Sequence, residues 1–485
     1  MKKRILSLLL LAVISASLFA CGGDVDAGKT TDTVADPADS LPAGIEKKNY
    51  ADAPVDILYP NWGLYRNYFH SDENTGEAID VALFNRELKV EEYLGVDISH
   101  TMVDIIENIP SKVREITMAG DDLHQMVLAH CIVGISTMAT EGMLYDLASI
   151  ATVDTTTDWW NSDSMENLTV GGKQFYAVND YMIPDPNAVI FNRDFIKVYD
   201  LEDPYDIVRE GDWTFDTMIS MMKTVTTDNG DGQWDINDTY GFGCPNDWFL
   251  TSFVYSADLL LLKKDADDLY TLAFGMNERT IKLADKLDVL LNGPDTFLYG
   301  FTHDFPGYNG YDETKSLSIK KGRTLFGLVT LNDLHTYRDT TVDFGLLPYP
   351  KLDSEQENYI SLDWSGLMCV PASVKNPEMV GEVIELLAYY SDEEVLPAYY
   401  DLVLGEKLSR DEDSKEMLDI IFDGIVYDAG MNYFGFGAKN LGKFWDFGDE
   451  ISAANWSGLS SFVAKYEEGA KTEIAQFNEK ILDLD

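Results

Sequence analysis

The chain has 485 residues, 45% of them hydrophobic and 12% aromatic, which is enough apolar material for a core in two or three domains. Its 84 acidic and 36 basic residues give a formal net charge of −48. This charge argues against a nucleic-acid partner and against adsorption to anionic lipid, because both are themselves negatively charged. A neutral ligand suits the chain best and a cationic ligand second. Four cysteines without a CxxC pair give no sign of a disulfide framework.

The N-terminus has the parts of a secretory signal. Residues 2–4 are basic, and an apolar run over 5–16 follows that is too short to span a membrane comfortably. Residues 18–21 (LFAC) resemble the lipobox of bacterial lipoproteins, although Phe19 stands where that pattern usually has a small residue. The resemblance implies that Cys21 is lipidated and becomes the new N-terminus. The protein would then lie outside the cytoplasm, held at the outer face of the bacterial membrane by its lipid anchor alone. The alternative is an ordinary signal peptide with a chance cysteine.

A polar segment separates this signal from the folded body. Residues 22–49 contain no aromatic side chain and are rich in Asp, Thr, Ala, Gly and Pro. Such a composition is typical of a solvated, flexible tether. We expect the ordered part of the chain to begin near Tyr50.

Strand and helix patterns alternate after the tether. Alternating or continuous apolar runs predict strands over 55–59, 95–98 and 125–129. Helical spacing of apolar residues predicts a helix over 81–94 that ends at a glycine, and another around 113–116. This alternation predicts a mainly parallel sheet with helices on its faces, which is an α/β fold.

Two later helices have clear start signals. Asn376 is followed by Pro377 and an acid, which indicates an N-cap, a proline at the first helical position and a first-turn carboxylate. Apolar residues at helical spacing continue from there to Tyr390. Thr214 is the expected N-cap of a second helix whose apolar face includes Met218.

Several segments, in consistent order along almost the whole chain, resemble those of the family 1 extracellular solute-binding proteins of ABC importers. They are residues 171–178 (GGKQFYAV), 191–195 (FNRDF), 201–216 (LEDPY through GDWTFD), 321–326 (KGRTLF), 344–351 (FGLLPYPK), 370–371 (VP) and 376–378 (NPE). In that family, the first of these segments is a strand that leads into the hinge between two lobes. The ordered spacing of the segments indicates the family, but it does not identify the ligand.

The resemblance implies a two-lobed α/β fold of the periplasmic-binding-protein-like type II, with hinge strands that cross between the lobes. By analogy, lobe one holds residues 50–179 and 328–372, and lobe two holds 180–327 and 373–485. Such a protein closes on a small solute and delivers it to the permease subunits of an ABC transporter. The family likeness also implies a monomer.

A sugar pocket needs aromatic faces for C–H surfaces and carboxylates or amides for paired hydroxyls, so a tryptophan or tyrosine beside Asp or Asn is the pattern to seek. The candidate ligand-binding residues that follow this pattern are Asn61 and Trp62, Asp180 and Tyr181, Asp247 and Trp248, and Asp363 and Trp364. For any one tryptophan, the alternative is packing in the core.

Residues 226–238 resemble a calcium-binding loop. The candidate ligands for a structural Ca²⁺ are Asn229, Asp231, Gln233, Asp235 and Asp238. The loop departs from the standard pattern at its first position, which is Thr227 in place of Asp, and at its twelfth, which is Asp238 in place of Glu. The alternative is an acidic turn without metal.

No catalytic motif is present: the sequence lacks HExxH, GxSxG and a phosphate-binding glycine loop. His124 and His130 lack the spacing of helical metal ligands and are of the kind that is usually structural or on the surface. No cofactor and no enzymatic activity are therefore expected. The alternatives to a sugar receptor are a receptor for a peptide or polyamine, a secreted glycoside hydrolase with two catalytic carboxylates, or a lipoprotein that senses a ligand and signals.

Overall fold

The structure is a computed structural model, and it describes most of the chain after residue 41. The described residues are 42–63, 68–71, 76–244, 247–292, 297–299, 318–337, 340–408, 412–435, 437–452 and 457–484. Residues 42–485 form one compact unit. The signal segment, Cys21 and the predicted tether up to residue 41 lie outside the described residues.

The first sheet contains the predicted N-terminal strands. Its order is β12-β3-β1-β2 (Leu367–Cys369, Met126–Ala129, Ala53–Pro60 and Val96–Val103). β1 pairs in parallel with β2 and β3, and β12 pairs antiparallel with β3. The helix α1 (Ala78–Leu94) joins β1 to β2 and ends at Gly95, whose φ of 62° lies in the left-handed region that glycine adopts without strain. The strands and the helix predicted here are confirmed.

The second sheet is mixed, which corrects the expectation of a mainly parallel sheet. Its order is β10-β4-β9-β5-β8 (Phe344–Leu347, Asn187–Asn192, Thr324–Thr330, Tyr240–Cys244 and Phe297–Tyr299). β5 runs parallel to β8 and β9, whereas β4 runs antiparallel to β9 and β10. The reason is that β4 enters this sheet from the first half of the chain, and β9 and β10 return in the opposite direction.

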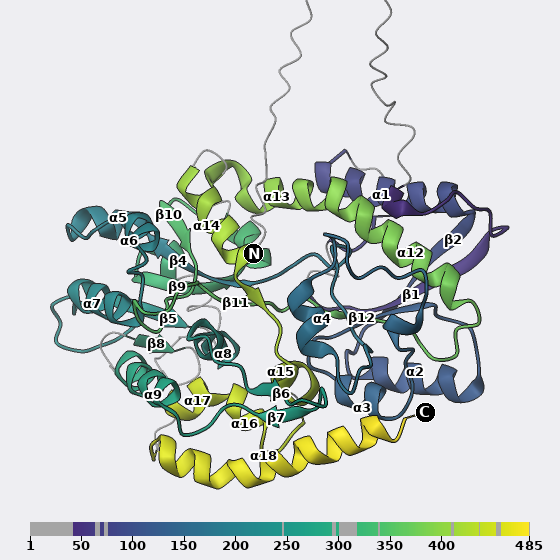
Figure 1. Cartoon of the computed structure of the whole chain (residues 1–485). Helices are drawn as coiled ribbons and strands as arrows, with labels where there is room; N and C mark the ends of the chain where they lie inside the picture. Colours follow the sequence, from purple (N-terminus) through teal and green to yellow (C-terminus); the bar gives the residue numbers. More distant parts are fainter. Residues whose placement is uncertain are drawn as a thin grey trace, which may run out of the picture. The chain divides into compact units, whose positions relative to one another are not determined.

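Helices surround both sheets (Figure 1). In chain order, after α1, they are α2 (Asn108–Ala119), α3 (Ile135–Thr140), α4 (Ser162–Leu168), α5 (Arg193–Val198), α6 (Pro204–Glu210), α7 (Phe215–Val225), α8 (Asp247–Ser256), α9 (Glu278–Leu291), α11 (Ser318–Lys320), α12 (Pro377–Tyr390), α13 (Leu396–Leu408), α14 (Glu412–Asp423), α15 (Ala429–Phe434), α16 (Gly442–Trp445), α17 (Phe447–Ser452) and α18 (Leu459–Leu482). Short strands pair as β6 (Leu262–Lys264) with β7 (Tyr270–Leu272) and as β11 (Ser361–Leu362) with β13 (Ile425–Val426). A π-helical turn (Ser391–Val395) joins α12 to α13, and short 3₁₀ turns lie at Pro42–Gly44, Leu147–Ser149 and Leu331–Tyr337.

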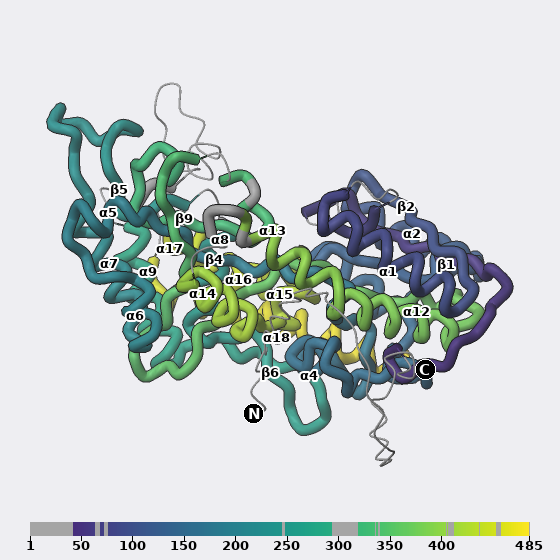
Figure 2. The backbone as a smooth tube through the Cα atoms, turned by 90° about the horizontal axis from the view of Figure 1, so that it is seen from above, coloured from purple at the N-terminus to yellow at the C-terminus, as the bar shows by residue number. Residues whose placement is uncertain are grey.

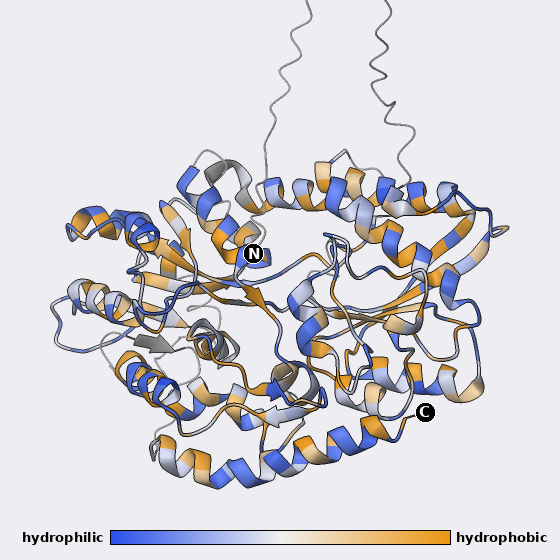
Figure 3. Cartoon of the chain, in the orientation of Figure 1, coloured by the Kyte–Doolittle hydropathy of each residue, from blue (hydrophilic) through white to orange (hydrophobic). Residues whose placement is uncertain are grey.

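The predicted helix caps are present. The Thr214 side chain accepts a hydrogen bond from the backbone N–H of Thr217, at 3.4 Å, at the start of α7. The Asn376 side chain accepts one from Met379 at the start of α12, with Pro377 as the first helical residue. The amphipathic pattern that predicted these helices is visible as alternating apolar and polar residues in Figure 3.

Two predicted lobe boundaries differ from the division that the two sheets make, in which the first lobe is built around the first sheet and the second lobe around the second. A boundary after residue 327 would divide β9 and place β10 in lobe one, but both strands belong to the second sheet. A boundary after residue 372 would place α12 in lobe two. Instead, Glu385 of α12 accepts hydrogen bonds from the indole N–H groups of Trp159 (2.7 Å) and Trp160 (3.0 Å), and α12 packs against α1. Strand pairing and helix packing decide to which lobe each element belongs, and neither can be read from the order of the elements along the chain.

The folded body begins before Tyr50, so residues 42–49 are not tether. The backbone N–H of Lys48 donates to the carbonyl of Tyr93 near the end of α1, and Tyr93 donates from its hydroxyl to the carbonyl of Ile45. Lys48 also pairs with Glu382 of α12. The prediction failed because backbone hydrogen bonds attach residues 42–49 to the end of α1, and amino-acid composition does not reveal such bonds.

Two segments pass between the sheets side by side, and we call residues 179–186 and 361–366 the crossing segments. The backbone N–H of Asp185 donates to the carboxylate of Asp363 at 2.7 Å, and the N–H of Trp364 donates to the carbonyl of Asp185 at 3.3 Å. The α12–π-turn–α13 run makes another connection, which Figure 2 shows from above. The preceding segment 171–178 forms isolated bridges, not the regular strand expected from the resemblance.

The core is continuous across much of the chain. The larger cluster of buried apolar residues draws members from both sheets, and a smaller one joins α1, α13 and α14 to the second sheet. The C-terminal helix α18, yellow in Figure 1, packs against both β7 and α3. Among the described residues, no helix combines the length and the apolar character needed to cross a bilayer.

Candidate functional site

Polar and aromatic side chains gather where the parallel strands of the first sheet end. β1 ends at Pro60, and the next residue, Asn61, donates from its backbone N–H to the carbonyl of Val103 at the end of β2. The side-chain amide of Asn61 donates to Asp104 at 3.4 Å. Ligands bind most often at the carboxyl ends of strands in sheets of this kind. The predicted pair Asn61 and Trp62 therefore lies at the edge where a solute site is expected.

Trp62 packs against a histidine that follows β3. The ring centroids of Trp62 and His130 are 4.0 Å apart, with the planes tilted by 47°. His130 is 5% exposed, and this burial lowers the pKa of its imidazole to about 3. Its Nδ1 lies 3.3 Å from the backbone N–H of Ile132 and accepts from it, so the proton of the neutral ring is on Nε2. The result is an uncharged aromatic pair in which His130 can donate from Nε2–H.

A second aromatic pair joins α8 to a crossing segment. The rings of Trp248 and Trp364 are stacked, with centroids 6.0 Å apart and planes within 26°. Trp248 lies in the first turn of α8 and is 49% exposed, whereas Trp364 is 6% exposed. An exposed indole face supported by a buried one is a stable apolar platform of the size of a sugar ring.

A buried carboxylate holds Trp364 in place. Asp363 is 2% exposed, and its oxygens accept hydrogen bonds from the Tyr427 hydroxyl (2.6 Å), the Ser365 hydroxyl and the backbone N–H of Asp185. Burial raises the pKa of the Asp363 carboxyl, and these donors oppose the rise. Asp363 is therefore turned inward, and its role in this conformation is to support the platform.

Asp185 is the second buried acid of the crossing segments. Burial raises the pKa of its carboxyl to about 8, and the nearby charges of Asp333 and Asp363 add to the rise. One of its oxygens accepts from the backbone N–H of Asn332 at 2.9 Å. At neutral pH this acid is mostly protonated, which removes the repulsion that two adjacent buried carboxylates would otherwise have.

The remaining predicted ligand-binding residues do not join these pairs in the contacts that the structure gives. Tyr181, in the crossing segment 179–186, is 2% exposed, and its ring packs under the guanidinium of Arg86. Asp180, beside it, is half-buried and donates its backbone N–H to the carbonyl of Trp159. Asp247 begins α8, but its side chain lies outside the described part.

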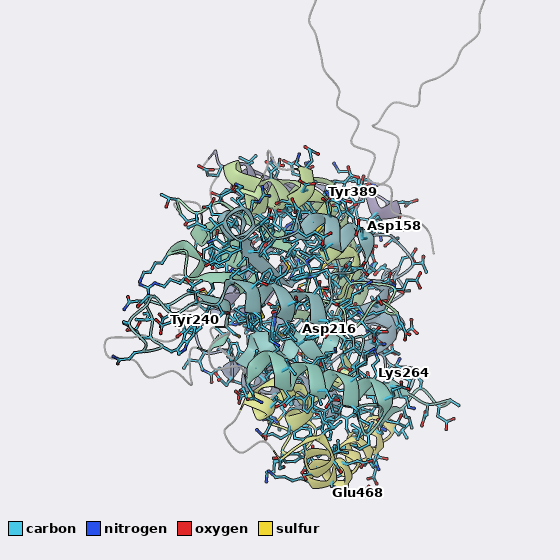
Figure 4. All side chains as sticks on the ribbon, turned by 90° about the vertical axis from the view of Figure 1, so that its left-hand side faces the viewer. Asp158, Asp216, Tyr240, Lys264, Tyr389 and Glu468 are labelled. Carbon is cyan, nitrogen blue, oxygen red and sulfur yellow. The ribbon has the colours of Figure 1, made fainter. Side chains whose placement is uncertain are left out.

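The calcium-like loop between α7 and β5 is organised by its own carboxylates and amides. Asp238 is 1% exposed and accepts from the backbone N–H groups of Asn229 (2.8 Å) and Asp235 (2.5 Å). Asn229 accepts from the N–H of Asp231, and Asp231 from that of Gln233. Figure 4 labels Tyr240, the strand residue that follows the loop. No group of three or more His, Cys, Asp or Glu side chains among the described residues is arranged to hold a metal ion, so calcium binding stays a prediction.

A cavity of about 440 Å³ lies apart from both aromatic pairs. Its lining comes from α4, from the end of α14, from β13 and from the loop that precedes β11. The lining residues are Asp163, Glu357, Asn358, Tyr359, Ile360, Ile420, Asp423, Gly424, Ile425 and Val426. None of the predicted site residues belongs to this set.

The fold was compared with solved structures, and several sugar-binding proteins share it. The cyclic alpha-maltosyl-1,6-maltose binding protein of Arthrobacter globiformis superposes with a TM-score of 0.58 at 13% identity, covering 87% of this chain and 99% of that one. The maltose-binding periplasmic protein of Listeria monocytogenes, in complex with maltose, gives 0.56 at 12% identity, covering 88% and 98%. The maltose/maltodextrin-binding domain of Bdellovibrio bacteriovorus, bound to maltotriose, gives 0.53 at 17% identity, covering 87% and 100%. The chain has the fold of an ABC solute-binding protein.

The two-lobed α/β solute-binding fold predicted from the sequence is thus confirmed. No protein-family model matches the sequence, and no curated protein matches it either. The structural neighbours named here are binding proteins and not enzymes. The evidence for the solute-binding fold is therefore the arrangement of the elements in space, at low sequence identity.

Sequence reasoning missed three residues of this site. His130 was treated as structural or on the surface, although its position directly after a buried strand is a usable signal. Asp185 and Tyr427 were not singled out, because their partner Asp363 is remote along the chain. No local pattern in the sequence announces that network.

Proposed function

We propose that this protein is an extracellular solute-binding lipoprotein that captures a neutral sugar or oligosaccharide and delivers it to an ABC transporter permease. The observation that carries the proposal is the half-exposed ring of Trp248 stacked on the buried ring of Trp364. Indole faces bind the C–H surface of a pyranose through dispersion and burial of apolar area. A solute that rests on this platform contacts α8 and the hinge at the same time.

The first sheet supplies the complementary chemistry. Trp62 on His130 offers a second aromatic face, and the Nε2–H of neutral His130 is a donor suited to a hydroxyl. Asn61 and Asp104 offer an amide and a carboxylate side by side, which is the combination that paired sugar hydroxyls accept. Closure of the two lobes would bring these groups together on one solute.

The charge of the chain supports a neutral solute. A net charge of −48 disfavours sugar phosphates and other anions through long-range repulsion. The described residues of the two aromatic pairs carry no fixed charge, because His130 is neutral and the partners are indoles. A polyamine would need several carboxylates turned toward it. Asp363, the acid next to the platform, is turned inward, which leaves Asp104 as the carboxylate that the groups named here offer.

Transport and anchoring rest on the N-terminal sequence and on the fold. Membrane attachment through Cys21 predicts that Cys21→Ser releases the protein into the soluble fraction and abolishes labelling with radioactive palmitate. Wild-type protein that stays soluble and unlabelled would contradict the anchor. That result would leave solute binding untouched.

Thermal unfolding against a panel of solutes tests the binding function. A ligand that binds only the folded state raises the melting temperature, and the rise grows with the logarithm of its concentration once that exceeds Kd. We expect such a concentration-dependent rise with maltotriose or related oligosaccharides and none with peptides or polyamines, with the sugar recovered intact by chromatography. A rise only with spermidine or a peptide would overturn the sugar assignment, and release of shorter sugars would identify a hydrolase.

A further inference from the structure

Arg86 of α1 is a charged side chain inside the core. It is 0% exposed, and no described acceptor lies within hydrogen-bond distance of its Nε. Burying a guanidinium costs free energy unless the group is paired, and an apolar side chain would serve packing alone at lower cost. The contacts of Arg86 therefore indicate a role beyond packing.

The contacts of Arg86 extend to three separate segments. Its Nη2 donates to the carbonyl of Phe69 at 2.6 Å, and its Nη1 donates to the hydroxyl of Ser391 at 3.2 Å. The guanidinium carbon lies 4.5 Å from the ring centroid of Tyr181. Ser391 begins the π-helical turn, and Tyr181 lies in a crossing segment. One side chain of α1 thus holds two of the connections between the lobes.

Both of these connections change lobe close to the contact. Asn179 still pairs with Trp160 on the first-lobe side, and β4 of the second sheet begins at Asn187. Upstream of the π-turn, α12 is fixed to the first lobe by Glu385, and downstream the side chains of α13 enter the cluster of the second sheet. A π-turn interrupts the regular α-helical ladder and is frequent at functional sites.

A neighbouring carboxylate balances the charge of Arg86. Glu87 Oε1 lies 3.3 Å from Nη2 of Arg86 and 3.3 Å from Nε2 of His100. Burial acts to raise the pKa of Glu87, but the adjacent imidazole of His100 and the charge of Arg86 outweigh it and hold this pKa below its usual value. The guanidinium is therefore paired with Glu87, while its Nη1 contacts the π-turn and its face contacts Tyr181 of the crossing segment.

We infer that Arg86 is the positioning residue of the hinge: it fixes the angle at which the crossing segment 179–186 and the α12–α13 connection leave the first lobe. That angle sets what fraction of the sugar-free protein is in the binding-competent conformation. The apparent Kd for solute varies inversely with this fraction. The inference rests on the proposed function only where it predicts affinity. Its prediction for the sugar-free conformation is independent of that function.

Two spin labels, one in each lobe, measure this angle. Lys112 of α2 and Lys223 of α7 are exposed, so Lys112→Cys and Lys223→Cys in the full-length chain with Cys21→Ser give two accessible thiols. Cys131, Cys244 and Cys369 are buried. Pulsed electron paramagnetic resonance then gives the distribution of distances between the labels without sugar and with saturating maltotriose.

Arg86→Met keeps the length of the side chain and removes the fork. We expect a shifted or broadened sugar-free distribution, a sugar-bound distribution like that of the wild type, and an apparent Kd for maltotriose changed by about fivefold or more. Arg209→Met is the matched control, because Arg209 bonds Asp413 and Glu416 within the second lobe, and it should change neither quantity. If Arg86→Met does not fold, Arg86→Lys keeps the charge without the bidentate geometry and should give a smaller shift in the same direction.

A lower melting temperature with an unchanged Kd and unchanged distance distributions would overturn the inference, because Arg86 would then serve stability alone. If wild-type protein binds no sugar, the proposed function fails. The sugar-free distances still decide the role of Arg86 in that case: a shift in the Arg86 variant supports it, and distributions identical to those of the wild type reject it.

Discussion

The two aromatic pairs of the candidate site differ in how the protein supports them. Trp62 and His130 both lie on loops that directly follow strands of one sheet. Trp248 and Trp364 come from α8 and from a crossing segment, more than a hundred residues apart. In both pairs, a more exposed indole packs against a buried ring. In the first pair the buried ring is His130, which burial keeps uncharged. In the second pair the buried ring is Trp364, which lies beside the buried acids Asp363 and Asp185, and burial raises the pKa of both acids.

The difference indicates that only one of the two pairs depends on the geometry of the hinge. The pair on the first sheet is fixed by strands within one lobe, so a movement of the hinge carries it as a rigid unit. The other pair shares its buried ring with the hinge, so the position of the platform and the geometry of the crossing segments are linked. A change in the network around Asp363 should therefore affect stability and binding together, whereas a change at His130 should affect binding alone.

The largest effect is expected from Trp364→Ala. Removing a buried tryptophan leaves a cavity and should lower the free energy of unfolding by about 3–5 kcal/mol. It also removes the support of Trp248, so affinity for maltotriose should fall as well. Denaturant unfolding and calorimetry measure the two quantities. A loss of stability with unchanged affinity would break the proposed link between the hinge and the platform.

The next effect concerns pH and Asp185. Because the folded-state pKa of Asp185 is raised to about 8 from 3.8, the folded protein retains a proton that the unfolded chain releases. The contribution of this group to stability is therefore present at low pH and is lost as pH rises from about 4 to about 8. Asp185→Asn, which mimics the protonated acid, should reduce the fall in the free energy of unfolding between pH 4 and pH 8 by more than about 1 kcal/mol.

The control for this experiment is Asp121→Asn on the surface, where the group is exposed and the pH profile of stability should stay that of the wild type. Thermal unfolding from pH 4 to pH 9 gives the three profiles. Identical profiles for Asp185→Asn and the wild type would show that the hinge acid carries no retained proton.

Much of the fold could be predicted from the sequence, because it depends on local signals. The strand at 55–59, the helix that ends at Gly95 and the cap at Asn376 were all identified from periodicity and capping chemistry. The lobe boundaries could not be predicted, because they depend on pairing between distant strands and on α12 returning to the first lobe.

The candidate site divides along the same line. The tryptophans were found because an aromatic residue beside Asp or Asn is a local pattern. Their supports were missed or misplaced, because burial decides their roles. Asp363 was expected to face the solute and is turned inward, and His130 was set aside although it forms half of a pair. Burial of a polar group is a property of the tertiary structure, and no window of sequence contains it.

The smallest predicted effect is that of pH on the affinity for sugar. Because burial holds the pKa of His130 at about 3, its ring stays neutral across the physiological range. Affinity for a neutral sugar should therefore be constant within about twofold between pH 5 and pH 7, where an exposed histidine would titrate but Asp185 stays mostly protonated. A step in affinity near pH 6.5 would show that His130 gains charge and that the two aromatic pairs differ in electrostatics as well as in support.

The measurement that tests the central claim most directly is a calorimetric titration of maltotriose into wild-type protein, Trp248→Ala and Trp234→Ala. Both tryptophans are partly exposed, at 49% and 39%, but Trp234 lies in the calcium-like loop, away from either pair. We predict saturable binding by the wild type and by Trp234→Ala, with affinity reduced about tenfold to a hundredfold in Trp248→Ala at nearly unchanged stability. Equal affinity in all three proteins, or no binding by the wild type, would contradict the assignment of the Trp248–Trp364 platform as the sugar site.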